Sequence, residues 1–255
     1  MLGEPPYPSG PSVCRVAGLP VQRLRTGELI DAMVRAAADG MPTRVCYLNA
    51  HNFNLADNDP SLRRALSTAD ILYADGISVV WASRLWGPRL PGRLTSADYV
   101  ESFYDACARE GLSVFLLGGR PGVADRAAEA LRARRASLVV AGTHAGYFDD
   151  HDGVIDRINR SGADVLIVGM GSPRQELWTW RHADRIDSPV IWSVGALLDY
   201  LAGEEPRAPQ WVCRLGCEWL FRLLADPGGK WRRYLVGNPR FVWSVLRHRL
   251  MDRAA

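Results

Sequence analysis

The chain has 255 residues, of which 47% are hydrophobic and 23% are charged, with a formal net charge of +3. A chain of this length and apolar content can bury a full hydrophobic core, so we expect a globular protein and not a disordered one. The length favours one large domain with an appendage. The five cysteines are scattered and contain no Cys-x-x-Cys pair, so a zinc or redox motif is not indicated and we expect reduced thiols.

The first 18 residues are rich in proline and glycine and predict a flexible leader. They contain no basic stretch followed by an apolar one, so we expect no cleaved secretion signal. No run reaches the roughly 18 uninterrupted apolar residues that a membrane-spanning helix needs. We therefore expect a cytoplasmic protein whose membrane contact, if it has one, is peripheral.

Short apolar runs rich in β-branched residues alternate with helical patterns from residue 19 to residue 206, which is typical of a parallel sheet covered by helices. We therefore predict an α/β, Rossmann-like catalytic body over residues 19–206. The expected strands are Arg44–Leu48, Ile71–Tyr73, Ser113–Leu117, Leu138–Ala141, Asp164–Met170 and Val190–Val194. The expected helix starts are Thr26, Asp59 followed by Pro60, and a capping box over Thr95–Asp98.

Ligands of such sheets bind beyond the carboxyl ends of the strands, so the loops there are the places to search. The loop Leu117–Gly122 follows a strand and opens a helix, where backbone N–H groups can approach a phosphate. A plain tight turn explains this loop equally well. The loop Gly169–Glu176 begins like a dinucleotide fingerprint, but Arg174 stands where the third glycine belongs. Ala141 and Gly142 occupy the place of the ribose-binding acid, so a nicotinamide-dependent oxidoreductase is a weak alternative.

A third loop, Ala74–Gly76, places one carboxylate directly after a strand and before a helix. Asp75 could act there as a general base toward a hydroxyl group. Taken alone, an Asp-Gly pair is more often a turn or a helix cap. No Ser/His/Asp triad and no metal cluster is recognisable, and Asp57 and Asp59 lie at a helix start, where Asp59 has a capping role.

The C-terminal segment, residues 207–255, holds ten basic residues against three acidic ones and four of the nine tryptophans. The remainder of the chain has 21 basic and 25 acidic residues. This asymmetry predicts a basic, amphipathic helical appendage that meets an anionic, partly apolar partner, best fitted by a membrane surface or a lipid-linked phosphate. Its aromatic residues suit the lipid headgroup level, although some must pack on the body. These residues are Trp211, Trp219, Trp231, Tyr234 and Trp243.

A noncatalytic adaptor for membranes or single-stranded nucleic acid is a second alternative, because basic stripes with aromatics also suit bases. That alternative leaves the strand-end loops unexplained, and we expect no nucleic acid partner. The loops instead carry an ordered set of short motifs between residues 43 and 245. They are Leu48–Ala50, Ala74–Gly76, Pro91–Arg93, Val114–Gly119 with Pro121–Gly122, Gly146–Phe148, Gly169–Glu176, Val194–Gly195, Arg207–Pro209, Gly216–Trp219, Arg222, Pro227 and Arg233–Tyr234.

In this order the motifs resemble the WecG/TagA/CpsF glycosyltransferases, which build bacterial surface polymers on polyprenyl-diphosphate carriers. The resemblance implies metal-independent, inverting transfer of a hexosyl or N-acetylhexosaminyl group from a UDP-sugar to a polyprenyl-diphosphate-linked sugar, with no cofactor. Asp75 matches the catalytic base of the family. Asn49 and Gln175 match positions near the nucleotide, and Arg93 matches an arginine suggested to meet diphosphate.

The resemblance also implies that arginines of the appendage complete the site at the inner face of the cell membrane, and it is compatible with a homo-oligomer. Arg222 has a simpler explanation, because Arg214, Glu218 and Arg222 are spaced for ion pairs along one helix. The substrate-binding residues expected on this basis are Asn49, Arg93, Gly118, Gly119, Gly169, Gly171, Gln175, Glu176, Arg207, Arg222, Arg232 and Arg233.

The sequence departs from the family pattern at two positions. Tyr47 stands where a threonine commonly precedes Leu-Asn, and Ser96 replaces the glycine usual three residues after Arg93. The first difference can change the hydrogen bonding of the base or acceptor, and the second can narrow the sugar pocket. Asp75 is unaffected, so we expect the reaction class to persist while the sugar remains open.

Overall fold

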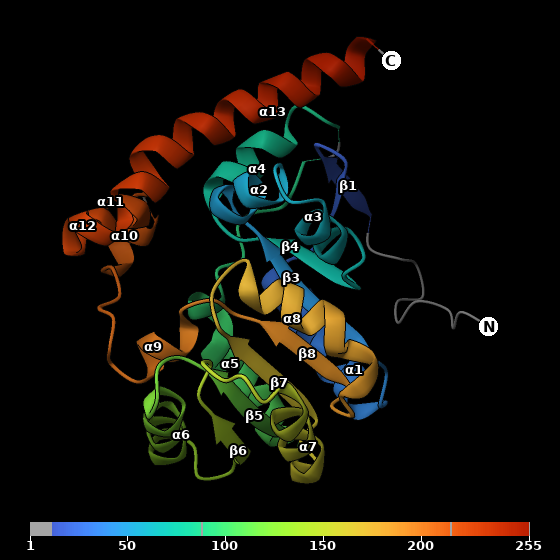
Figure 1. The fold of residues 1–255 in the computed structure, drawn as a ribbon, viewed down its shortest axis with the longest axis vertical. Coiled ribbons are helices and arrows are strands. Elements are labelled where there is room, and N and C mark those ends of the chain that lie inside the picture. Colours follow the sequence, from blue (N-terminus) through green and yellow to red (C-terminus); the bar gives the residue numbers. More distant parts are fainter. Residues whose placement is uncertain (1–11, 88, 215, 255) are drawn as a thin grey trace.

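Six parallel strands form the centre of the protein, in the order β4-β3-β8-β7-β5-β6 (Figure 1). The structure is a computed structural model that describes residues 12–87, 89–214 and 216–254. The strands are β3 Thr43–Leu48, β4 Ile71–Ala74, β5 Ser113–Gly118, β6 Val139–His144, β7 Val165–Gly169 and β8 Val190–Ser193. All six predicted strands are confirmed, with ends that agree to within three residues.

Helices cover both faces of this sheet. One face packs on α1 Thr26–Ala38, α5 Ser96–Arg109, α6 Val123–Arg134 and α9 Leu197–Leu201. The other packs on α2 Ala50–Ala56, α3 Pro60–Ser67, α4 Ile77–Ser83, α7 His151–Ser161 and α8 Arg174–His182, which the short 3-10 turn η1 Ala183–Arg185 follows. Successive strand side chains point to opposite faces, so Tyr47 enters the first core and Leu48 the second. The predicted α/β, Rossmann-like fold is confirmed.

The predicted helix starts are confirmed in position but not all in mechanism. Asp59 caps α3, since its side chain accepts hydrogen bonds from the Ser61 and Leu62 N–H groups at 2.9 and 3.2 Å. Helix α1 begins at Thr26 itself, one residue earlier than expected. Thr95 precedes α5, but its side chain makes no capping bond, so the predicted capping box is wrong. The Thr95 hydroxyl instead contributes to the site described below.

The N-terminal hairpin corrects the prediction of a flexible leader for residues 12–18. Strands β1 Val13–Val16 and β2 Leu19–Gln22 pair antiparallel. Cys14 and Val16 are fully buried, because the strand alternates apolar residues inward, a pattern that the proline- and glycine-rich surroundings disguise. Residues 1–11 of the predicted leader lie outside the described residues.

The C-terminal segment forms a string of helices that runs from the side of the sheet across its top (Figure 1). These elements are α10 Gln210–Arg214, α11 Glu218–Ala225, α12 Pro227–Trp231, the π-helical turn η2 Arg232–Val236 and α13 Gly237–Ala254. Helix α13 packs on α2, with Phe53 and Phe241 edge to face at 5.1 Å. Asp57 accepts a hydrogen bond from Ser244 Oγ at 2.6 Å, and His248 Nε2 lies 2.7 Å from its other oxygen. The appendage is therefore docked on the body by specific contacts.

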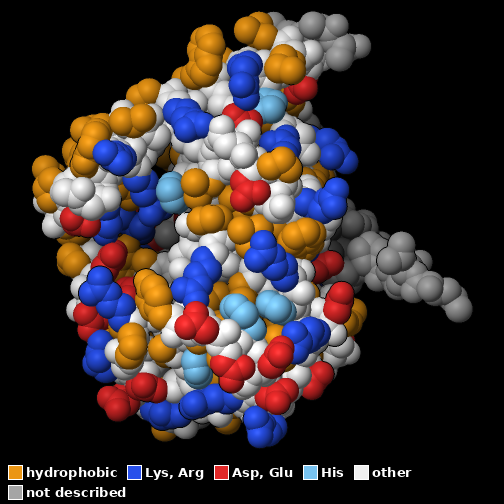
Figure 2. Space-filling model, in the orientation of Figure 1, with side chains coloured by type: hydrophobic (Ala, Val, Ile, Leu, Met, Phe, Trp, Pro, Cys, Tyr) orange, Lys and Arg blue, Asp and Glu red, His pale blue; other side chains and the backbone are white. Residues whose placement is uncertain are grey.

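Helix α13 is apolar on two opposite sides. Residues of an α-helix are about 100° apart around the axis, which places the buried Phe241 and Val245 opposite Trp243 and Leu250. The latter are 69% and 68% exposed. Figure 2 shows hydrophobic side chains exposed along the α10–α13 edge, with arginines between them. Within the ranges that the structure describes, no helix combines the length and hydropathy needed to cross a bilayer.

Candidate active site

Asp75 lies at the carboxyl edge of the sheet, directly after β4. Its N–H donates to the Leu48 carbonyl at 2.8 Å, which continues the β3–β4 ladder by one residue and fixes the backbone beneath the carboxylate. Gly76 follows with φ of 99°, a left-handed conformation that glycine adopts without strain, and it turns the chain into α4. The side chain is thus held where the family resemblance requires a base.

Asn49 donates to this carboxylate, with 3.3 Å between Asn49 Nδ2 and Asp75 Oδ2. The orientation of its amide is set by α2, because Asn49 Oδ1 accepts from the His51 and Asn52 N–H groups. Asn52 Oδ1 accepts from the Asn49 N–H at 2.8 Å, which completes the cap. The helix cap therefore leaves only the N–H₂ end of Asn49 to face Asp75.

Asp75 is a more basic carboxyl group than an ordinary aspartate. Burial raises its pKa, and the negative charge of Glu218 raises it further. The charge of Arg222 and hydrogen bonds from Asn49 and Thr95 oppose this shift without cancelling it. The bond from Thr95 explains why that hydroxyl does not cap α5. A raised pKa suits a group that must remove a proton from a sugar hydroxyl.

A cavity of about 520 Å³ opens above Asp75, between the body and the appendage. Its polar residues are Asn49, His51, Asp75, Ser78, Arg93, Thr95, Glu218, Arg222, Arg233, Tyr234 and Asn238. Its apolar walls come from α4 and α13. They include Ile77, Trp81, Ala82, Leu85, Phe241, Val242, Val245 and Leu246. The site thus joins a charged floor to an apolar mouth.

Three of the predicted arginines line this cavity. Arg93 Nη1 lies 3.6 Å from Glu218 and Arg93 Nη2 lies 3.4 Å from Asp98. Arg222 Nε donates to Glu218 at 3.0 Å, and its guanidinium lies 5.3 Å from the Tyr200 ring centre. The expected ion pair along the helix is confirmed for Glu218 and Arg222, and the same arginine also faces the cavity. The buried Nε of Arg233 has no hydrogen-bond partner among the described residues.

The other expected arginines lie outside the cavity. Arg207 forms an ion pair with Asp98 of α5. The Arg232 guanidinium lies 5.3 Å from the Trp231 ring centre. Their proposed contact with substrate thus receives no support from the geometry of the cavity, and both remain predictions.

The predicted glycines lie at the carboxyl ends of β5 and β7 but do not line the cavity either. Gly118 has a packing explanation, because a Cβ there would lie 2.3 Å from the Gly169 carbonyl oxygen of the neighbouring strand. Gly119 would similarly clash with Val123. Close packing accounts for Gly118 and Gly119, and a substrate-binding role for Gly118, Gly119, Gly169 and Gly171 stays a prediction.

Gln175 and Glu176 are fully buried. Gln175 Oε1 accepts from the Gly195 N–H at 3.0 Å, and its Nε2 donates to the Tyr47 hydroxyl at 3.1 Å. Burial raises the pKa of Glu176. The tyrosine that departs from the family pattern therefore ties β3 to α8, and neither Gln175 nor Glu176 faces the cavity.

Several residues of the site were not singled out from the sequence. Glu218 stands within a quoted motif, and Thr95 within the expected capping box, but neither had an assigned role. His51 follows Asn49 and lines the cavity. Burial and the charge of Arg233 lower its pKa to about 4. The apolar wall of α4 has no signal in sequence beyond a helical pattern, because its exposure depends on how α13 docks.

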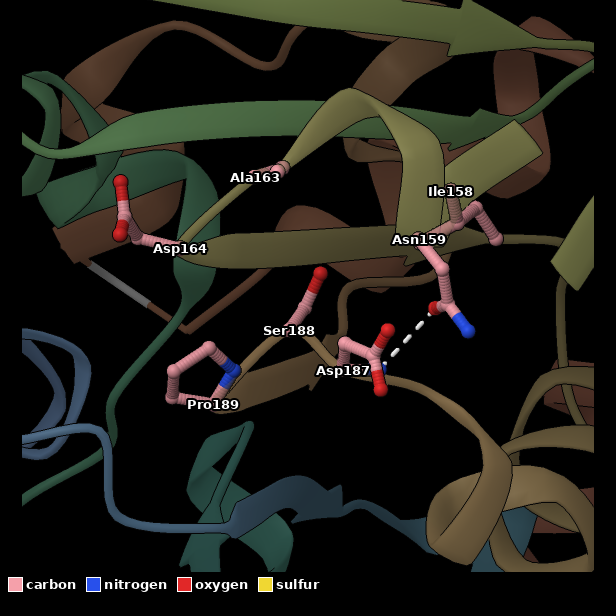
Figure 3. Close-up of a pocket in the computed structure, with 8 residues that line it drawn as sticks. Ile158, Asn159, Ala163, Asp164, Asp187, Ser188 and Pro189 are labelled. Carbon is pink, nitrogen blue, oxygen red and sulfur yellow. Dashed lines mark hydrogen bonds between the residues drawn. The ribbon is translucent and has the colours of Figure 1, made fainter. Parts of the chain in front are cut away.

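A second hollow, of about 210 Å³, lies at the amino ends of β7 and β8 (Figure 3). There Asp164 accepts hydrogen bonds from the N–H and hydroxyl of Ser113, both at 2.7 Å. The Asp187 N–H donates to Asn159 at 3.0 Å. This hollow faces away from the ligand-binding edge of the sheet, and it holds no residue of the predicted site.

The sequence profile of the glycosyl transferase WecG/TagA/CpsF family matches residues 14–255. The chain belongs to this family. The match includes the N-terminal hairpin and the whole appendage, so both are parts of the WecG/TagA/CpsF architecture. The predicted resemblance is confirmed, and the protein is a glycosyltransferase. An oxidoreductase and a noncatalytic adaptor are accordingly set aside.

A relative from Bacillus spizizenii is 32% identical over 193 residues, which cover 76% of this chain and 74% of the relative. It is named N-acetylglucosaminyldiphosphoundecaprenol N-acetyl-beta-D-mannosaminyltransferase. Its name therefore describes transfer of an amino sugar to a sugar carried on a lipid diphosphate. This chain is thus a WecG/TagA/CpsF transferase of cell-surface polysaccharide synthesis.

Proposed function

We propose that this protein transfers a hexosyl or N-acetylhexosaminyl group from a UDP-sugar to the hydroxyl of a sugar linked to polyprenyl diphosphate. The observation that carries the proposal is Asp75, a base of raised pKa at the floor of a cavity that also holds three arginines and apolar walls. Each part of that cavity matches one part of the two substrates.

Asp75 is the general base of the proposed reaction. It removes the proton of the acceptor hydroxyl while that oxygen bonds to the anomeric carbon and the bond from this carbon to UDP breaks. The attack is in line, so the anomeric configuration inverts. Asn49, fixed by the α2 cap, keeps the carboxylate aimed at the hydroxyl.

The charge that grows on the departing UDP is met by arginines in this proposal. Arg93, Arg222 and Arg233 line the cavity, and guanidinium groups offer paired, permanently charged donors to phosphate oxygens. The transfer needs no metal ion in this scheme. To test this, transfer is measured with and without a metal chelator. We expect the chelator to leave the rate of transfer unchanged.

The apolar walls suit the lipid part of the acceptor. The side chains of α4 and α13 lead from Asp75 to the surface, and Trp81 is 58% exposed at this mouth. The name of the Bacillus relative specifies a diphosphoundecaprenol acceptor, and we propose the same class of acceptor here. The donor sugar and the sugar that accepts it remain open.

The exposed face of the appendage is proposed to lie on an anionic membrane at the cytoplasmic side. Trp211, Leu224, Trp243 and Leu250 are each at least 65% exposed, and arginines flank them along the segment. Aromatic and aliphatic side chains of an interfacial helix enter the headgroup boundary while arginines meet lipid phosphates. Removal of residues 207–255 is expected to abolish binding to anionic vesicles.

The deciding experiment measures UDP release from a panel of UDP-sugars, with and without a polyprenyl-diphosphate-linked sugar, for the wild type and Asp75→Asn. Release that needs the acceptor and is lost in the variant is the expected result. Full activity of the variant would exclude Asp75 as the base. If no donor is turned over, the effect of UDP on the melting temperature distinguishes a missing acceptor from a wrong nucleotide.

A further inference from the structure

Glu218, in the first turn of α11, stands between an arginine of the body and an arginine of the appendage. Its Oε1 accepts from Arg222 Nε at 3.0 Å, and its Oε2 lies 3.6 Å from Arg93 Nη1. We propose that Glu218 is a positioning residue of the transfer reaction, which holds Arg93 and Arg222 together at the diphosphate position and sets the charge beside Asp75. The inference rests on the function proposed above.

The bridge overcomes a repulsion that the site would otherwise contain. Arg93 comes from the loop before α5 and Arg222 from α11, and both line one cavity. Two guanidinium groups in one cavity repel each other unless an anion lies between them. Before the substrate arrives, the carboxylate of Glu218 is that anion. When a diphosphate enters, the two arginines are already oriented toward it.

Glu218 also makes a group of arginines compatible with a base. Arginines near Asp75 lower the pKa of this carboxyl group, which weakens it as a base, whereas Glu218 raises that pKa. A site for diphosphate alone needs only the cations. A site that also removes a proton needs an anion to offset them, and Glu218 supplies it from the same helix as Arg222.

The charged and titratable groups around Asp75 and Glu218 come from several elements. The groups coupled to Asp75 or Glu218 are Arg93 before α5, Tyr200 on α9, Cys213 on α10, Arg222 on α11, and Tyr47, Tyr73 and Tyr99 of the core. His51 and Arg233 line the same cavity, and Asp98 pairs with Arg93 and Arg207 at its edge. The three core tyrosines stay neutral, since burial raises their pKa. Glu218 is therefore the acidic neighbour that acts on Asp75 most strongly.

A purely structural role for Glu218 makes a different prediction. Its pair with Arg222 has the helical spacing of four residues, and such a pair contributes little to the stability of a fold. If that were its whole role, its loss would change stability slightly and leave the pH dependence of transfer unchanged.

The test compares Glu218→Gln and Glu218→Asp with the wild type in the transfer assay across pH. For Glu218→Gln we expect kcat/KM to fall by up to about 100-fold and the acidic limb of its pH profile to move to lower pH. Glu218→Asp keeps the charge but draws back from Arg93, so we expect a lower rate with the acidic limb unmoved. Wild-type rates and an unmoved limb in Glu218→Gln would overturn the proposal.

A matched control is Glu205→Gln. Glu205 also bridges the body and the appendage, through Lys230 at 3.2 Å, but it does not line the cavity. Its variant should keep the wild-type pH profile. An equal shift in Glu205→Gln would overturn a specific role for Glu218.

A second measurement follows the Asp75 carboxyl carbon by NMR titration, without substrates, in wild type and Glu218→Gln. The Asp75 titration should move to lower pH in the variant, and an unmoved titration would disprove the charge coupling. If the wild type transfers no sugar and UDP does not raise its melting temperature, the proposed function fails, yet this titration still decides whether Glu218 acts on Asp75.

Discussion

Two tryptophans packed at the sheet of the body and two of the appendage lie in opposite surroundings. Trp192 on β8 is fully buried and Trp178 on α8 is 4% exposed, whereas Trp211 and Trp243 of the appendage are 65% and 69% exposed. The sheet is covered on both faces, so most of its apolar side chains have protein neighbours. The appendage is a string of helices on one side of the body, so its outer face has no protein to cover it. One residue type thus marks a core in one region and a contact surface in the other.

The two regions also divide the proposed chemistry. The body supplies the base and its orienting amide, whereas the appendage supplies Arg222, Arg233 and Glu218 to the same cavity. Transfer and membrane binding should therefore be separable by mutation, although both depend on how α13 docks. The following predictions test that separation, from the largest expected effect to the smallest.

Asp75→Asn should lower kcat by roughly 10²–10⁴-fold, the contribution typical of a general base, while vesicle binding persists. The variant should also melt at a higher temperature at pH 7. A raised pKa contributes stability at low pH that is lost as pH rises through the folded-state value, so the ionised carboxylate destabilises the fold at pH 7. UDP release measures the loss of kcat, and thermal unfolding measures the change in melting temperature. Loss of vesicle binding in this variant would contradict the independence of transfer and membrane binding.

The double variant Trp243→Glu, Leu250→Glu should lower affinity for anionic vesicles by at least about 100-fold, because each side chain contributes about 1.5–3 kcal/mol when it leaves water. Neither side chain lines the cavity, so transfer to a short-chain, water-soluble acceptor should continue. Co-sedimentation with vesicles measures the effect. Val139→Glu, at an exposed position of β6, is the control; an equal loss there would contradict a role specific to α13.

Asp57→Asn should destabilise the protein by about 1.5–3 kcal/mol, the usual value for hydrogen bonds to a charged group. Burial alone would raise the pKa of Asp57, but Ser244, His248 and Arg247 lower it on balance. The stabilisation is therefore complete at neutral pH and is lost only as pH falls through the lowered value. Denaturant unfolding measures the change. Asp59→Asn is the control, because asparagine caps a helix as well as aspartate does.

His51 should make stability fall slightly as pH drops below neutrality. Its pKa is lowered from 6.5 to about 4 by burial and by Arg233, so between these values the unfolded chain binds a proton that the folded protein excludes. His51→Gln should flatten the dependence of the melting temperature on pH between about 4 and 6.5. An identical slope in the variant would mean that His51 binds a proton equally well in the folded and unfolded chain, and would contradict the lowered pKa.

Much of the body could be predicted from the sequence because its signals are local. Each strand is a short apolar run, and Asp59 with Pro60 begins a helix by its own side-chain chemistry. Asp75 was correctly predicted to lie at the carboxyl edge of the sheet, because the carboxyl ends of parallel strands lie along one edge. The Thr95 cap failed for a tertiary reason, since Asp75 competes for the same hydroxyl.

The remainder of the site depended on contacts between segments far apart in the chain. Glu218 and Arg93 are 125 positions apart in sequence, and no local pattern pairs them. The glycines at the ends of β5 and β7 were predicted to bind substrate, but the close approach of the two strands also explains Gly118. The sequence also left undecided which side of α13 packs on the body, because this helix has apolar residues on two opposite sides.

The sequence by itself determined the sheet, the family and the proposed base, because periodicity and short motifs are written along the chain. It also determined that the appendage is basic and rich in aromatics. Only the tertiary structure decided that α13 closes a cavity over Asp75 and that Glu218 joins Arg93 to Arg222 within it. Docking between body and appendage sets these relations, since it depends on the shape and charge of both surfaces together.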